Sequence, residues 1–125
     1  MPENMVPSQA FDIVDNPLRG ENAMQSLSGT SFAKHHTADT TNFTLTWVAD
    51  RDAVDDDILC AWLKTVFTSH NGCPSDCAKV LIQAFYNTLM PLHCTLQWQY
   101  TLPSGAVRKL HILRHQPLYK LPEGL

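Results

Sequence analysis

The chain has 125 residues, an apolar fraction of 44% and a formal charge of −3. This length predicts one domain, or one domain with a loose arm, and the acidic balance argues against a nucleic-acid binder. No apolar run approaches the ~20 residues of a membrane span, and the first ten residues lack the features of a secretory signal. Four cysteines without such a signal favour reduced thiols and a cytoplasmic location.

The beginning of the chain is rich in proline and lacks sustained periodicity. Residues 1–22 are therefore expected to form an N-terminal arm, with at most a short element within residues 11–14. The arm would be either disordered or laid over a neighbouring subunit. A short strand is expected over residues 24–32, the domain over residues 23–116 and a C-terminal tail over residues 117–125.

The middle of the chain predicts a strand followed by two helices. Residues 42–48 alternate apolar and polar side chains, as a half-buried strand does. The aspartates of residues 50–57 suit the start of a helix, where negative charge is favourable, although an acidic metal site is the alternative. Helices are expected over residues 54–68 and 75–89. The side chains expected to face the core from them are Ile58, Trp62, Val66, Leu59 and Leu63, then Ala78, Leu81, Ile82, Phe85 and Leu89.

A hairpin is predicted after the helices. Apolar residues alternate with Thr and Gln from Cys94 to Leu102, a turn sequence follows, and a second strand leads to Leu113. These elements predict an α+β fold in which two helices pack on one face of an antiparallel sheet. The other face would meet water or line a closed barrel of subunits. Its basic residues either attract an anion or are simply solvated; they are Arg108, Lys109 and Arg114.

Short motifs along this frame suggest a family. Phe67-Thr-Ser-His-Asn71 stands where the first helix should end, Asp76-Cys77 where the second begins, and Met90-Pro91 before the hairpin, while Asp39 precedes the first long strand. With this spacing, residues 11–115 resemble the tunnelling-fold enzymes, most closely the 7-cyano-7-deazaguanine reductases of queuosine biosynthesis.

The resemblance implies a tunnelling fold whose subunits assemble into barrels with ligand pockets at their interfaces. It also implies a purine- or pterin-like ligand, with Asp39 as the match to the family's catalytic aspartate and as a ligand contact. His36 lies close enough in sequence to serve Asp39 as a proton shuttle, unless it belongs to a solvated loop. The candidate ligand-binding residues are Asp39, His70, Ser75 and Asp76.

Three positions depart from the family pattern. Phe32 stands where the family has its nucleophilic cysteine, and a phenyl ring cannot form the covalent thioimide. Asp56-Asp-Ile-Leu59 lacks the lysine that pairs with the nucleotide phosphate, and Ser75 replaces the glutamate that anchors the purine edge. We therefore expect no NADPH-dependent nitrile reduction.

One cluster has the residue types of a zinc site. His70, Cys73 and Cys77 supply an imidazole and two thiolates, and His93 or Cys94 would have to complete the four ligands that structural zinc prefers. The alternative is that Cys77 faces the core as a small apolar residue.

Three functions follow as hypotheses. The first is a catalytically altered relative of the deazaguanine reductases that retains a ligand pocket at a subunit interface. The second is a non-enzymatic assembly or interaction protein, and the third is a zinc-assisted hydrolase of the cyclohydrolase kind. The expected partners are further copies of the chain, or an intact homologue that supplies the missing residues.

Overall fold

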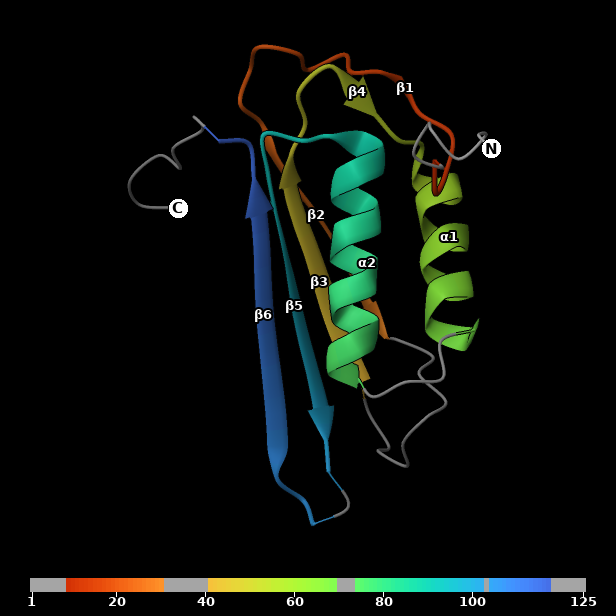
Figure 1. Cartoon of the computed structure of the whole chain (residues 1–125), viewed down its shortest axis with the longest axis vertical. Helices are drawn as coiled ribbons and strands as arrows, with labels where there is room; N and C mark the ends of the chain where they lie inside the picture. Colours follow the sequence, from red (N-terminus) through yellow and green to blue (C-terminus); the bar gives the residue numbers. More distant parts are fainter. Residues whose placement is uncertain (1–8, 31–40, 70–73, 103, 118–125) are drawn as a thin grey trace, which may run out of the picture.

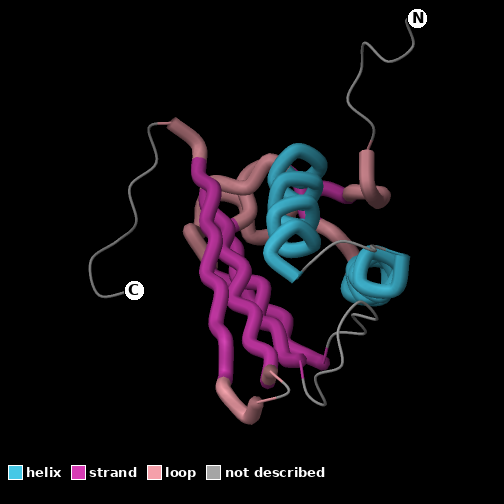
Figure 2. The backbone as a smooth tube through the Cα atoms, turned by 60° about the horizontal axis from the view of Figure 1, so that its bottom comes forward, coloured by secondary structure: helices cyan, strands magenta, loops and turns pink. Residues whose placement is uncertain are grey.

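The computed structural model describes residues 9–30, 41–69, 74–102 and 104–117. Figure 1 shows two helices lying on one face of an antiparallel sheet, which confirms the predicted α+β class. Figure 2 shows the same two layers from another side. The elements are β1 (Val14–Asp15), β2 (Met24–Thr30), β3 (Thr41–Val48), β4 (Asp52–Ala53), α1 (Asp56–Ser69), α2 (Pro74–Leu89), β5 (His93–Thr101) and β6 (Val107–His115).

The main sheet has the strand order β2-β3-β5-β6, and every neighbouring pair is antiparallel. Both helices lie in the chain between β3 and β5, the two inner strands. Phe43 and Leu45 of β3 stand opposite Trp98 and Leu96 of β5. Because side chains alternate along a strand, these apolar residues all point to the inner face, towards the helices. The opposite, outer face is covered by neither helix.

Local hydrogen bonds and backbone conformations explain where the two helices begin and end. Asp55 stands just before α1, and its side chain accepts a hydrogen bond of 3.2 Å from the backbone N–H of Asp57, as a capping residue does. Pro74 opens α2, where its missing N–H would have no partner within the helix. Met90 ends α2 with a left-handed backbone, φ 52°, and donates its N–H to the Tyr86 carbonyl oxygen at 2.8 Å.

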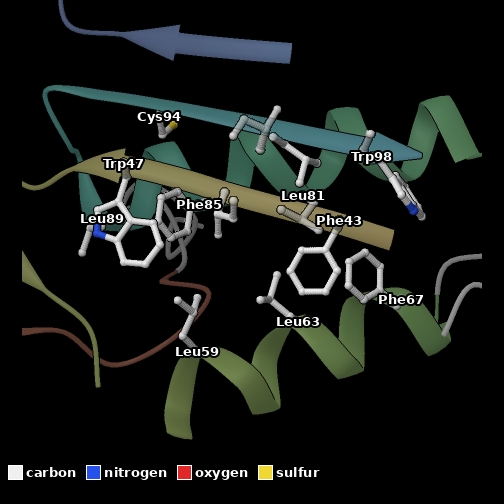
Figure 3. Close-up of a cluster of buried hydrophobic side chains, with 14 of the residues drawn as sticks. Phe43, Trp47, Leu59, Leu63, Phe67, Leu81, Phe85, Leu89, Cys94 and Trp98 are labelled. Atoms are coloured by element: carbon white, nitrogen blue, oxygen red, sulfur yellow. The ribbon is translucent and has the colours of Figure 1, made fainter. Parts of the chain in front are cut away.

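The first helix meets the core along part of the face that its pattern predicted. Leu59 and Leu63 are buried as expected, and Trp62 and Val66 are partly buried against the core. Ile58 is exposed instead, and Phe67, which was not among the expected residues, is buried. The Phe67 ring packs on both β3 and β5 (Figure 3), so the side of α1 that carries Leu63 and Phe67 faces the sheet.

The second helix and β5 match their predicted inner faces. All five expected residues of α2 are buried, and so are Cys94, Leu96, Trp98 and Tyr100 of β5. The alternation predicted in the hairpin fails only at Leu102, which lies beyond the end of β5 and is exposed. The core thus lies between the two helices and the two inner strands.

Residues 9–22 pack against the domain of the same chain, unlike the loose arm that the sequence predicted. The Phe11 ring is buried 5.0 Å from that of Trp62 and 5.9 Å from that of Phe85, measured between centroids. β1 pairs with β4, and the Asn16 side chain donates a 2.8 Å hydrogen bond to the Asp50 carbonyl oxygen. Burial of the large Phe11 ring helps to attach residues 9–22 to the domain, although their proline content indicated a loose arm.

Candidate functional site

The end of the molecule where α1 stops and α2 starts is the part nearest in sequence to the predicted ligand residues. β3 begins and β2 stops at this same end (Figure 1). We call it the loop end. Four predicted site residues lie outside the described part of the chain, as does Phe32: they are His36, Asp39, His70 and Cys73.

Two predicted ligand residues stand in the first turn of α2 at the loop end. Ser75 and Asp76 are both exposed there, and the Asp76 carboxylate is placed where the helix dipole favours negative charge. The next residue, Cys77, points into the core instead. Burial raises the pKa of the Cys77 thiol to about 11, so it is protonated at neutral pH. Facing the core is the alternative that the sequence left open for this cysteine.

Three aromatic rings close the core at the loop end. Phe67 of α1 lies 5.1 Å from Phe43 and 5.3 Å from Trp98, centroid to centroid. Trp98 is 1% exposed, and its indole N–H has no acceptor within the part of the chain that the structure describes. Figure 3 shows the indole nitrogen at the outermost edge of the cluster. A buried N–H normally has a hydrogen-bond partner, so this donor is the clearest polar feature of the loop end.

A small apolar pocket of about 140 Å³ opens between α1 and the edge strand β2 near the loop end. Its walls include Leu27 of β2, Phe43 of β3, and Leu63 and Phe67 of α1. Gly29 leaves the Phe43 ring uncovered, since a Cβ there would come within 3.3 Å of it. The pocket could accept a small apolar or aromatic group. Sequence reasoning missed it because the pocket depends on the rotation of α1.

The outer face of the sheet carries a second, polar hollow of about 390 Å³. We call it the outer hollow, and the side chains that reach it by strand alternation come from β3, β5 and β6. They are Asn42, Thr44, Gln97, Gln99, Lys109 and His111. The alternating Thr and Gln of the hairpin indicated this polar face, but their pattern does not predict that the face is hollowed.

His93 is buried although its position in β5 assigns it to the outer face. Its direct cross-strand neighbour is His115. Desolvation by burial, with further contributions from His115 and His111, lowers the pKa of His93 below its usual 6.5. The imidazole is therefore neutral at physiological pH.

The described residues contain no group of three His, Cys, Asp or Glu side chains arranged to hold a metal ion. Neither helix in this part of the chain is long and apolar enough to cross a membrane. The described residues offer two separate places for a ligand: an apolar pocket at the loop end and a polar hollow on the outer face of the sheet. No protein-family model matches the chain, and no curated protein matches its sequence.

Proposed function

We propose that this chain is a subunit of a tunnelling-type oligomer that binds a purine- or pterin-like ligand at the loop end without reducing nitriles. The observation that carries the proposal is the topology: two helices inserted between the inner strands of a sheet whose order is β2-β3-β5-β6. The resemblance noted above implies this arrangement, together with pockets shared between neighbouring subunits.

The edges of the sheet support assembly. β2 and β6 each pair on one side only within the described residues, so both present unpaired backbone groups on their other side. β6 is nine residues long and β2 seven. Long exposed edges are rare in proteins that remain monomeric, because such edges invite pairing with another chain. Strand addition at both edges would join subunits into a continuous sheet.

The loop end supports ligand binding. The loop end offers a planar heterocycle an apolar pocket beside Phe43 and Phe67, and Ser75 and Asp76 are exposed polar side chains at the same end of the molecule. Aromatic walls with a few placed polar groups are typical of small-molecule sites. The resemblance implies a further contact from Asp39, which lies outside the described residues, as the acceptor for the ring N–H groups.

The identity of residue 32 is the reason that the proposal excludes nitrile reduction. The covalent step of a nitrile reductase needs a thiolate to add to the nitrile carbon, and Phe32 has no nucleophilic atom. A pocket that binds its ligand but lacks the nucleophile would hold that ligand unchanged.

Light scattering and calorimetry together test the proposal. We expect a mass of several subunits at micromolar protein concentration, and binding of guanine, a pterin or 7-cyano-7-deazaguanine with a dissociation constant on the order of 1–10 μM. Asp39→Ala should abolish the binding heat, and Asp57→Ala, at the other end of α1, should retain it. A monomer that binds none of the three compounds would contradict the proposal.

A second candidate, a non-enzymatic assembly protein, is favoured by the same two open edges. It predicts the oligomer without any ligand. An oligomeric mass combined with no binding heat would therefore select this candidate over the first.

A further inference from the structure

The outer hollow lies on a face that neither helix covers, away from the ligand site proposed at the loop end. Cross-strand pairing arranges its side chains in two rows. Thr44, Gln97 and His111 stand side by side in one row. Asn42, Gln99 and Lys109 form the next row, and neighbouring strands are about 4.8 Å apart. The six side chains therefore line one open hollow on the sheet surface, and all of them except Thr44 are exposed to solvent.

The side chains of the outer hollow have hydrogen-bonding capacity to spare. Within the described part of the chain, no side-chain hydrogen bond and no ion pair is found for Asn42, Gln97, Gln99 or Lys109. Thr44 is the exception, since its hydroxyl is 3.0 Å from that of Ser28. Three amides and one ammonium thus face the hollow with donors and acceptors that a ligand could use.

The charge of the outer face is opposite in sign to that of the whole chain. The chain has a formal charge of −3, yet no described strand residue that alternation assigns to the outer face is Asp or Glu. The cations there are Lys109 and any protonated histidine. A cationic site without competing carboxylates attracts anions.

Strand alternation separates Lys109 from the other basic residues of β6. Arg108 and Arg114 belong to the inner face, and Arg114 donates a 2.9 Å hydrogen bond to the Gln83 side chain of α2. Lys109 is therefore the cation available to the hollow. The outer face also carries no described Phe, Tyr or Trp side chain, which argues against the base-stacking platform that single-stranded nucleic acids use.

From this geometry we infer that the outer hollow is a binding site for a small anion that carries hydroxyl groups, a phosphate or carboxylate joined to a polyol or sugar. The anionic group pairs with Lys109 and His111, and the hydroxyl groups exchange hydrogen bonds with the three amides. A volume of about 390 Å³ lies within the range of small-molecule sites.

Titration of the uniformly ¹⁵N-labelled full chain tests the inference by NMR, with ribose 5-phosphate, gluconate, inorganic phosphate and ribose as separate probes. Ribose 5-phosphate or gluconate should give saturable shifts confined to residues 42–44, 97–99 and 109–111, with half-saturation on the order of 1 mM. Inorganic phosphate should bind more weakly, because it lacks the hydroxyl groups, and ribose should bind least.

Two variants on adjacent positions of β6 sharpen the test. Lys109→Ala should weaken ribose 5-phosphate or gluconate binding about tenfold, as expected for losing a charge-assisted hydrogen bond. Arg108→Ala, exposed but on the other face, should change it by less than about twofold. Equal losses in the two variants would overturn the inference, because they would indicate a general charge effect. So would linear, unsaturable shifts with every probe, or shifts that map elsewhere. A face that only contacts solvent and has no binding site would give one of these three results.

Discussion

Phe67 of α1 and Trp98 of β5 meet with their ring centroids 5.3 Å apart and their planes inclined by 49°. Both side chains are almost completely buried. This contact joins the last full turn of the first helix to an inner strand of the sheet, and it determines which face of α1 is turned towards the core.

Truncation of Phe67 should therefore be costly. Phe67→Ala removes a buried ring that also lies 5.1 Å from Phe43, and we expect the free energy of unfolding to fall by about 3–5 kcal/mol. Ile58→Ala, at an exposed position that the sequence pattern had assigned to the core, should cost less than about 1 kcal/mol. Urea denaturation followed by tryptophan fluorescence measures both. Equal costs would mean that Ile58 packs into the core as deeply as Phe67 does, contrary to the observed orientation of α1.

The docking of residues 9–22 depends on Phe11. Phe11→Ala should release this segment, because the ring fills the space between Trp62 and Phe85. We expect backbone amide exchange in residues 9–18 to accelerate at least tenfold, as in a locally unfolded segment. Asp12→Ala, at an exposed neighbouring position, should leave exchange unchanged. Equal protection in wild type and Phe11→Ala would show that the ring does not hold the segment.

Because two thiols are buried, we expect the free energy of unfolding to fall at alkaline pH. Burial raises the pKa of Cys77 to about 11 and that of Cys94 to about 12, from 9.0 for a free thiol. The unfolded chain thus releases these protons first as the pH rises. The stabilisation is complete below about pH 9 and declines between about pH 9 and 12. Urea midpoints should fall between pH 8 and 10.

The comparison that isolates this effect is the pH dependence of each variant. Cys94→Ala should show a shallower decline than the wild type, whatever its absolute stability, whereas Cys60→Ala, which removes an exposed thiol, should keep the wild-type slope. The same slope in all three proteins would assign the decline to other groups.

Met90 offers a stabilising substitution. Its left-handed backbone, φ 52°, strains any residue with a Cβ, and its side chain is 60% exposed. Met90→Gly should raise the free energy of unfolding by about 0.5–1 kcal/mol, because glycine adopts this conformation without strain. Met90→Ala keeps the Cβ and should bring no gain. A loss of stability in the glycine variant would show that the Met90 side chain contributes more than its exposure suggests.

The sequence predicted the elements that depend on local periodicity. The alternation of Cys94 to Tyr100 defined β5, and the apolar face of the second helix was correct at every expected position. On α1 it expected Ile58 in the core and did not expect Phe67 there, since the burial of Phe67 depends on contacts with Phe43 and Trp98 that are distant in sequence.

The candidate sites depended still more on tertiary structure. Alternation predicts that the Trp98 ring is buried. It does not predict that the indole N–H finds no acceptor among the described residues. The outer hollow needs the register that sets Gln97 beside His111 and Gln99 beside Lys109. Residues far apart in sequence cannot be assigned to one cavity from periodicity alone.

The position of the two helices between β3 and β5 also has a kinetic consequence. The β5–β6 hairpin is local, with a turn of a few residues between Thr101 and Val107. The central pairing, by contrast, opposes Val48 to His93 and encloses both helices in a single large loop. Closing a longer loop costs more chain entropy, and non-local pairing slows folding. We expect the final hairpin to assemble early and the join between β3 and β5 to be the slow event that completes the domain.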